Sequence, residues 1–231
     1  RPAGMAAPVR RQPRAQPDQI APVGGSFTWP VTLECGDLVL RPIRYRDRKE
    51  WTQVRSRNSE WLAPWEASNP VPGGGLPDYR QMVRSLKAQA AQATALPFLI
   101  TAWTPGFREP LIVGQLTVSS IVWGSAMMAT LGYWVDKDRA GQGIAPTAVA
   151  LATDYCFQTL GLHRMEINIR PENRPSLRVV EKLGFRDEGY RPRYLHINGA
   201  WADHRTFALT SEEVPGGLLA RWLETRPAQA P

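Results

Sequence analysis

Residues 134–156 read WVDKDRAGQGIAPTAVALATDYC, an apolar strand-like end, a glycine turn and then an apolar run typical of a helix. Gly141 and Gly143 permit positive φ and let a ligand approach the main chain closely. The backbone N–H groups after them would point outward at the positive end of the helix dipole, which suits a pyrophosphate. Pro146 fits the first helical turn, where its missing N–H costs nothing. The pattern therefore predicts an anion-binding turn at residues 141–145.

Other glycine-rich phosphate motifs do not match this turn. No Gly-Lys-Ser/Thr follows it, so it is not a P-loop, and the third glycine and later acid of a dinucleotide fingerprint are missing. A lone G-x-G is common by chance, so an ordinary turn that uses glycine for geometry alone is the alternative.

Length and composition place the chain among globular proteins. Its 231 residues suit one domain, and its 43% hydrophobic and 21% charged residues are ordinary for such a domain. Two cysteines, Cys35 and Cys156, are too few for a disulfide framework, and we expect both to be buried thiols. The N-terminus resembles no signal peptide and no apolar run could span a membrane, which predicts a cytoplasmic protein.

The net charge of +7 favours an acidic partner, whether nucleic acid, a phosphorylated cofactor or an acidic protein surface. Part of this charge lies in residues 1–30, which are rich in proline and arginine and show neither helical nor strand periodicity. We expect an N-terminal arm over residues 1–30 and one domain over residues 31–231. The arm is either a solvated extension or a contact with the ribosome or RNA.

Hydrophobic spacing predicts an α+β (mixed α/β) domain. Strands are expected at 37–43, 97–103, 111–123, 127–135 and 163–169, with two more around an Asn198-Gly199 hairpin turn, and helices near 45–58, 78–95, 145–160 and 173–184. A capping box at Thr210 to Glu213 precedes a short last helix. Short links favour a mostly antiparallel, twisted sheet with helices on both faces. One parallel strand pair, 127–135 and 163–169, would flank the crossover helix and splay apart at a site.

Residues 59–80 are too apolar for a surface loop and too rich in proline and glycine for a long helix. Trp61 and Trp65 lie in this segment. Two interpretations are equally favoured: a mobile flap over a pocket, or a short helix that caps the core.

A set of motifs together resembles the Gcn5-related N-acetyltransferase (GNAT) superfamily. They are GQGIA at 141–145, the Asn173-x-x-Ser176 pair, KLGF at 182–185, LVLRPI at 38–43 and WLAPWE at 61–66. The resemblance covers residues 35–209 and is closest to the RimJ/RimL type, which acetylates N-termini of ribosomal proteins.

The resemblance implies acetyl-CoA as the cosubstrate, without a metal. It implies that the backbone of Tyr133, Trp134 and Val135 pairs with the pantetheine arm. The pyrophosphate would lie on Gly141, Gln142, Gly143, Ile144 and Ala145. Asn173 would hydrogen-bond the pantetheine arm or cap the following helix, or do both. Ser176 would hydrogen-bond the departing sulfur, a position where relatives also carry serine, and its alternative is a first-turn residue without chemistry.

The general base is where the chain departs from the family pattern. The glutamates that relatives carry are replaced by Asn168 and Leu195. Glu66 is our candidate for the general base. Asp78, Glu166 or an ordered water are the alternatives for this role. Trp61, Trp65 and Tyr194 are expected to bind the acceptor. We expect Trp201 in the core and structural roles for the three histidines, His163, His196 and His204.

Three functions follow from these expectations. The first is direct acetyl transfer, in a ternary complex, to the N-terminal α-amine of a protein, plausibly a ribosomal one. The second is acetylation of a small amine such as an antibiotic or polyamine, which would need several acids at the pocket. The third is a non-catalytic acyl-CoA-binding or ribosome-associated module. The oligomeric state is left open.

Overall fold

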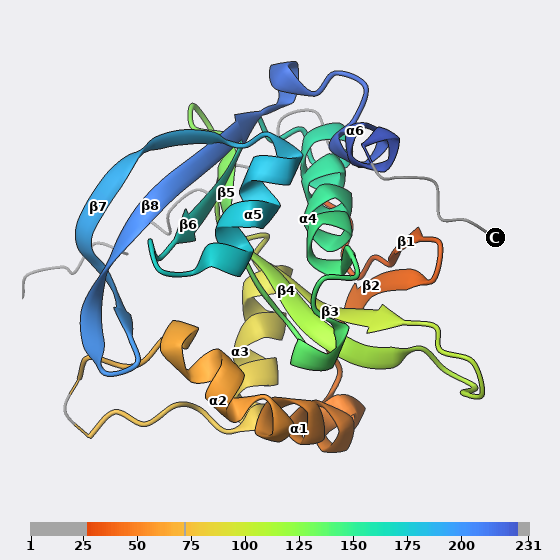
Figure 1. The fold of residues 1–231 in the computed structure, drawn as a ribbon, viewed down its shortest axis with the longest axis vertical. Coiled ribbons are helices and arrows are strands. Elements are labelled where there is room, and N and C mark those ends of the chain that lie inside the picture. The colour runs from red at the N-terminus through yellow and green to blue at the C-terminus, as the bar shows by residue number, and fades with distance from the viewer. Residues whose placement is uncertain (1–26, 72, 226–231) are drawn as a thin grey trace, which may run out of the picture.

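The computed structural model describes residues 27–71 and 73–225 (Figure 1). Its centre is an eight-stranded sheet of order β1-β2-β3-β4-β5-β6-β8-β7, in which only β5 and β6 are parallel neighbours. The strands are β1 (Leu33–Cys35), β2 (Leu38–Pro42), β3 (Leu96–Ala102), β4 (Leu111–Val122), β5 (Met128–Val135), β6 (Arg164–Ile169), β7 (Arg186–Ile197) and β8 (Ala200–Thr210). The predicted mixed, mostly antiparallel class is confirmed, and β1 is one strand that the sequence analysis missed.

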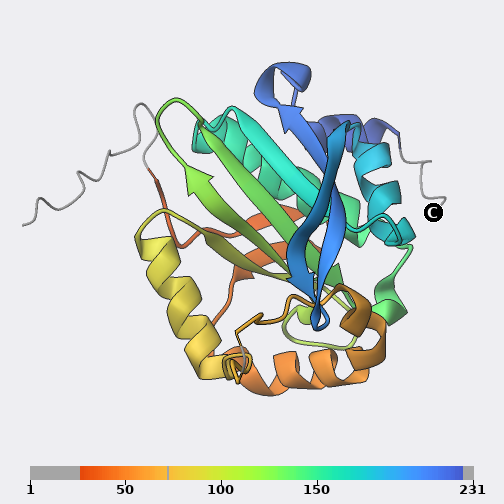
Figure 2. The ribbon, with the colours of Figure 1, turned by 90° about the vertical axis from the view of Figure 1, so that its left-hand side faces the viewer.

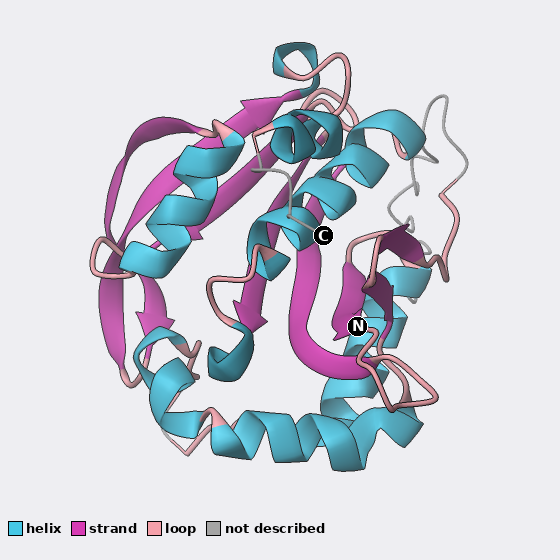
Figure 3. Cartoon of the chain, turned by 45° about the vertical axis from the view of Figure 1, so that its right-hand side comes forward, coloured by secondary structure: helices cyan, strands magenta, loops and turns pink. Residues whose placement is uncertain are grey.

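Helices cover both faces of this sheet, as predicted (Figure 2). The helices are α1 (Arg48–Arg57), α2 (Ser59–Leu62), α3 (Tyr79–Ala91), α4 (Ile144–Asp154), α5 (Arg174–Leu183) and α6 (Leu218–Glu224). Short turns of other helical types add η1 (Tyr45–Asp47), η2 (Ala63–Trp65), η3 (Lys137–Arg139), η4 (Tyr155–Thr159) and η5 (Ser211–Glu213). Helix α4 packs with α5 and α6, whereas α1 and α2 lie along one end of the sheet (Figure 3).

The alternation of side chains along β3 explains how the sheet carries two hydrophobic layers. Successive residues of a strand point to opposite faces. Phe98 and Ile100 are fully buried in the cluster that contains α4, whereas Leu99 is fully buried in a second cluster with Val54 of α1 and Val83 of α3. Burial on both faces makes β3 a central strand and fixes its register.

Strands β5 and β6 pair only at their beginnings. The parallel ladder joins Met128 to Arg164, Ala129 to Met165 and Thr130 to Glu166, but β5 continues to Val135 and β6 to Ile169. The strands therefore diverge after these pairs, which confirms the predicted splay. Residues 131–135 of β5 are hydrogen-bonded to β4 on one side only, and their other backbone edge faces the gap between the strands.

Gly114 allows β4 to approach the end of β5. A β-carbon built at this position would lie 2.3 Å from the carbonyl oxygen of Trp134. Gly114 also lies where the register between β3 and β4 shifts, because Ile100 pairs with Gly114 and the next residue, Thr101, pairs with Ile112. Only glycine fits this close approach, so it positions the strand end at which β5 leaves β6.

Residues 59–65 form the short helical turns α2 and η2, and an extended stretch follows. Their far end is tied to the β7–β8 hairpin, because Ala67 forms a bridge with Ile197, and Asn198 donates its N–H to the carbonyl of Glu66 at 2.9 Å. The segment contains the short helix of the second interpretation, and its Trp61 and Trp65 lie at a pocket, as in the first.

The β7–β8 hairpin contains both a confirmed and a wrong prediction. Asn198 and Gly199 have φ of 47° and 83°, as the predicted tight turn requires. Trp201, however, is 51% exposed, so its expected place in the core is wrong. The hairpin ends the sheet, and Trp201 packs edge-on against His196, with ring centres 5.4 Å apart.

The predictions for the cysteines and for the N-terminal arm are confirmed only in part. Cys156 is buried as expected, but Cys35 is only half-buried. The arm expected at residues 1–30 lies mostly outside the described residues, although Phe27 and Trp29 at its end pack against the core.

Candidate active site

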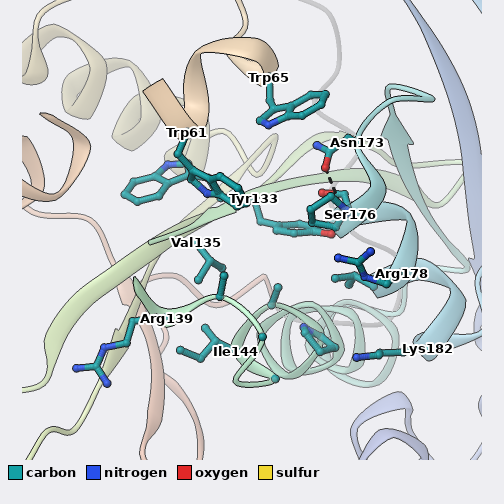
Figure 4. A pocket seen from close by; sticks show the side chains of 18 of the residues that line it. Trp61, Trp65, Tyr133, Val135, Arg139, Ile144, Asn173, Ser176, Arg178 and Lys182 are labelled. Atoms are coloured by element: carbon teal, nitrogen blue, oxygen red, sulfur yellow. Dashed lines mark hydrogen bonds between the residues drawn. The ribbon is translucent and has the colours of Figure 1, made fainter. Parts of the chain in front are cut away.

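A cavity of about 370 Å³ opens where β5 leaves β6 (Figure 4). It lies between the end of β5, the glycine turn, the first turns of α5 and the α2–η2 segment. It is lined by Trp61, Leu62, Trp65, Tyr133, Trp134, Val135, Arg139, Ala140, Gly141, Gly143, Ile144, Ala145, Pro146, Asn173, Pro175, Ser176, Arg178, Val179 and Lys182. The structure thus gathers most of the predicted cofactor residues around one space. Of that set, Gln142 does not line the cavity.

The glycine turn has the geometry of an anion-binding helix start. Gly141 and Gly143 have φ of 81° and 79°, and Gly143 is the N-cap of α4. No side chain in the part of the chain that the structure describes caps this helix end, and Ile144 and Ala145 of its first turn line the cavity. Gln142 turns away and donates its amide to the carbonyl of Asp138 at 3.3 Å. An uncapped N-terminus beside a cavity fits a diphosphate.

A buried polar network holds the start of this turn. Asp136 and Asn58, which are 1% and 2% exposed, are joined by a 2.8 Å bond from the Asn58 amide to a carboxylate oxygen. The Asn58 oxygen accepts the N–H of Lys137 at 2.9 Å, and Arg57 bonds to the other oxygen of Asp136. Burial opposes ionisation of Asp136, but Arg57 and Asn58 outweigh it and hold the pKa of this carboxyl below its usual value.

Asn173 caps α5 and places Ser176 at the cavity. The Asn173 side-chain oxygen accepts the backbone N–H of Ser176 at 3.2 Å (Figure 4). The expected N-cap role is confirmed, and it orders the first turn from which Ser176 faces the cavity. This bond leaves the Asn173 amide group for a second partner.

Tyr133 carries an unusual hydroxyl. Its ring packs against the core cluster that contains α4, and its hydroxyl oxygen is buried with no described atom at hydrogen-bond geometry. Burial raises the pKa of Tyr133 to about 12, and the nearby Ser176 hydroxyl partly offsets this rise. Ser176 is therefore close to Tyr133, but no bond of normal geometry joins the two hydroxyls.

The charged lining of the cavity is entirely basic. Arg139, Arg178 and Lys182 line it, and no Asp or Glu does among the described residues. The sequence analysis missed these cations. Two of them could have been found from their spacing, because Arg178 and Lys182 are four residues apart on α5 and share the face of the helix. Three cations beside an uncapped helix N-terminus suit a ligand with several phosphates.

The predicted acids are engaged elsewhere. Glu66 does not line the cavity, and its carboxylate accepts a hydrogen bond from Arg55. Buried Glu166 accepts from Arg164 at 2.8 Å. Asp78 caps α3 by accepting the N–H of Gln81 at 2.8 Å. Each carboxylate therefore has a structural partner.

Asn168 and Leu195 occupy the two positions at which the family resemblance implies a glutamate. The Asn168 side-chain oxygen accepts the hydroxyl of Thr206 at 2.7 Å. Leu195 is 40% exposed on β7. Neither residue lines the cavity.

The predicted acceptor residues divide into two groups. Trp61 and Trp65 line the cavity, and cations lie over both rings, Lys137 at 6.0 Å and Arg170 at 5.6 Å from the ring centres. Arg170 also donates to the carbonyl of Pro64 at 2.8 Å, which ties η2 to the end of β6. Tyr194 lies outside the cavity.

The histidines have structural contacts. His204 is 3% exposed, and burial lowers its pKa. It packs edge-on against Tyr194, and its Nδ1 lies 3.0 Å from the carbonyl of Ala202. His163 and His196 face Glu212 and Ser68, respectively, each at 2.9 Å.

Two features are absent from the part of the chain that the structure describes. The described residues contain no group of three or more His, Cys, Asp or Glu side chains that could hold a metal ion. None of their helices is long and apolar enough to cross a membrane.

Residues 37–186 match the family model described as the acetyltransferase (GNAT) domain. The chain belongs to the GNAT acetyltransferase family. This confirms the resemblance drawn from the motifs. A GNAT enzyme moves the acetyl group of acetyl-CoA to an amine nitrogen, so the chain is an acetyl-CoA-dependent N-acetyltransferase.

Similar GNAT proteins include ribosomal-protein acetyltransferases. The probable N-acetyltransferase YjcK of Bacillus subtilis (strain 168) is 39% identical over 177 residues, which are 76% of this chain and 95% of YjcK. The [ribosomal protein uS5]-alanine N-acetyltransferase of Escherichia coli (strain K12) is 31% identical over 80% of this chain and 94% of its own. The structure of Mycobacterium smegmatis RimJ in complex with CoA-disulfide has a TM-score of 0.76 and 36% identity, covering 85% of this chain and 95% of that one.

Proposed function

We propose that the enzyme acetylates the N-terminal α-amine of a protein, and that this protein is ribosomal. The observation that carries the proposal is the cavity lining, which holds Arg139, Arg178 and Lys182 and no described carboxylate. Such a lining attracts the phosphates of acetyl-CoA and repels a polycationic amine such as a polyamine or aminoglycoside. The similarity to an E. coli uS5-alanine acetyltransferase and to M. smegmatis RimJ supports the choice of acceptor.

The residues present fit acetyl-CoA. The free backbone edge of residues 133–135 would pair with the pantetheine amides, and the uncapped turn at residues 141–145 would hold the diphosphate. Asn173 would contact the pantetheine arm through its amide group. When bound, acetyl-CoA supplies an activated acetyl group as a thioester.

The chain's own groups then have three tasks. A backbone N–H at the end of β5 would polarise the acyl carbonyl, and Ser176 would donate a hydrogen bond to the departing sulfur. The third task is removal of a proton from the amine. An α-amine has a reference pKa of about 8, so part of it is neutral at pH 7 and an ordered water suffices as proton acceptor. Glu66 is the alternative proton acceptor, and the rate of a Glu66→Gln variant tests this role.

Direct transfer needs both substrates in the cavity together. Trp61 and Trp65 stand at the cavity opposite the first turn of α5 (Figure 4). We assign them to the acceptor peptide. The division into an arm at 1–30 and a domain at 31–231, the contact of the arm with ribosomal RNA, and a cytoplasmic location belong to the same proposal.

A product assay tests the acceptor class. Purified enzyme is incubated with acetyl-CoA and one amine at a time, and products are identified by mass. The peptides begin with Ala, Ser, Met or Asp, and the other amines are free lysine, spermidine and an aminoglycoside. A peptide with a blocked N-terminus and one internal lysine is the matched control. We expect turnover on free peptide N-termini only. Turnover on the small amines, with none on the peptides, contradicts the proposal.

A further inference from the structure

The Tyr133 hydroxyl is a buried polar group that has no partner at hydrogen-bond geometry among the described residues. Leaving a buried hydroxyl unpaired destabilises a folded protein, so such groups call for an explanation. Phenylalanine would fill the same space in the core without this cost. The position of the hydroxyl, at the cavity and beside Ser176, indicates what it is for.

We propose that Tyr133 is a positioning residue, whose hydroxyl donates a hydrogen bond to the Ser176 oxygen and so directs the Ser176 O–H at the departing sulfur. The inference rests on the proposed role of Ser176. The two side chains come from different elements, Tyr133 from the splayed end of β5 and Ser176 from the first turn of α5 (Figure 4). The backbone N–H of Ser176 is already bonded to Asn173, which holds this residue in place.

The proposed bond would fix the direction in which the Ser176 hydroxyl donates. A hydroxyl both accepts and donates, and Tyr133 has a single proton to give. If Tyr133 gives it to Ser176, the Ser176 proton is free to point into the cavity. Without Tyr133, the Ser176 hydroxyl can rotate freely, and the orientation that serves catalysis becomes one of several.

Neither hydroxyl acts as the proton source. Burial raises the pKa of Tyr133 to about 12, whereas a thiol has an ordinary pKa of about 8.5. Proton transfer from Tyr133 to a thiolate would therefore be strongly uphill. Both hydroxyls stay neutral and stabilise the charge that grows on sulfur.

The protons in the acetyl transfer are accounted for without a proton from either hydroxyl. The amine nitrogen bonds to the acyl carbon, the carbon–sulfur bond breaks, one amine proton goes to water, and the thiolate takes a proton from water.

The pKa of the coenzyme A thiol in its complex with the enzyme tests the role of Tyr133 and Ser176, and this measurement needs no amine substrate. The thiol is titrated in the complex by the ultraviolet absorbance of the thiolate, between about pH 6 and pH 10, with the protein alone subtracted to remove Cys35. We expect a lower thiol pKa in the wild-type complex than in free coenzyme A. Tyr133→Phe and Ser176→Ala should each raise it by about one unit. Arg178 and Lys182 also favour a thiolate, and both stay in every variant.

The matched control is Tyr155→Phe. It also removes a tyrosine hydroxyl, one that donates to the Thr28 carbonyl at 2.7 Å and lies outside the cavity. This variant should leave the thiol pKa unchanged. An unchanged thiol pKa in Tyr133→Phe overturns the proposal. Since the titration needs no amine, a wrong choice of acceptor does not affect it.

Rates test whether the two hydroxyls act as a unit. With any amine that the wild type acetylates, Tyr133→Phe should lower kcat by about tenfold and leave KM unchanged. In the Ser176→Ala background the same change should have little further effect. Independent, multiplicative losses contradict a shared role. Thermal unfolding is the folding control, and Tyr133→Phe should melt within roughly 4 °C of the wild type, because it keeps the buried ring and loses only one hydrogen bond.

Discussion

Asn58→Ala should destabilise the enzyme and weaken binding of acetyl-CoA together. The Asn58 side chain makes three bonds, to the Val54 carbonyl at 2.9 Å, to the Asp136 carboxylate at 2.8 Å and from the Lys137 N–H at 2.9 Å. A net hydrogen bond contributes about 0.5–1.5 kcal/mol, and the buried groups left behind cost more. Arg57 still pairs with Asp136, so we expect a loss of about 2–4 kcal/mol in the free energy of unfolding.

For a chain of this size, such a loss lowers Tm by roughly 5–15 °C. Lys137 begins η3, which leads into the turn that we assign to the diphosphate. The affinity for coenzyme A should therefore fall by roughly three- to tenfold, which corresponds to about 1 kcal/mol. Urea unfolding measures the first effect, and titration calorimetry with coenzyme A measures the second.

Asn69→Ala is the matched control. Asn69 is exposed, and its side chain accepts one local bond, from the N–H of Val71 at 2.9 Å. This variant should lose less than about 0.5 kcal/mol and bind coenzyme A normally. If Asn58→Ala unfolds at the same urea concentration as Asn69→Ala, the network does not stabilise the fold. If Asn58→Ala is unstable but binds coenzyme A as well as the wild type, the network does not position the turn.

Three further predictions concern pH, packing and capping. Arg57 and Asn58 hold the pKa of Asp136 in the folded protein below its unfolded value of about 3.9. The ionised Asp136 carboxylate therefore stabilises the fold above about pH 3.9, and this stabilisation is lost as the pH falls through the folded pKa. The free energy of unfolding, measured with urea, should be about 1–3 kcal/mol higher for the wild type than for Asp136→Asn near pH 7, and this difference should disappear below about pH 4. Gly114→Ala should lower Tm because its β-carbon would lie 2.3 Å from a β5 carbonyl, whereas Gly132→Ala, with nothing within 4 Å, should not. Asn173→Ala should lose about 1 kcal/mol in urea unfolding and slow turnover, and an Asp replacement should restore stability but not the rate.

Features that depend on one or two residues could be predicted from the sequence. Gly141 and Gly143 need positive φ, Gly184 ends α5 in the left-handed region, and Asn198 with Gly199 makes the hairpin turn. Each is a local demand on the backbone that few residue types meet, so the residue identifies the conformation.

Features that depend on a distant partner could not be predicted. Asn58 and Asp136 are 78 positions apart, and neither has a local signal for a shared site. Glu66 illustrates the same limit, because whether a carboxylate serves catalysis or structure depends on the cation that the fold places beside it, here Arg55. Trp201 was misjudged because its apolar ring indicates burial, whereas its place at the end of the sheet decides exposure.

One short segment, from the end of α1 into α2, contacts the strand end that leads to the proposed cofactor turn and also carries a tryptophan assigned to the acceptor. Arg57 and Asn58 end α1 and hold the start of the cofactor turn, and α2 follows at once with Trp61 at the cavity. Lys137, whose N–H is bonded to Asn58, lies over the Trp61 ring at 6.0 Å. Transfer between two bound substrates depends on their distance and angle, and small misplacements cost large factors in rate. Because Asn58 bonds to Lys137 and Lys137 lies over Trp61, we expect a shift of the turn to be passed on to the tryptophan. Such coupling would keep the proposed cofactor site and the proposed acceptor wall in register.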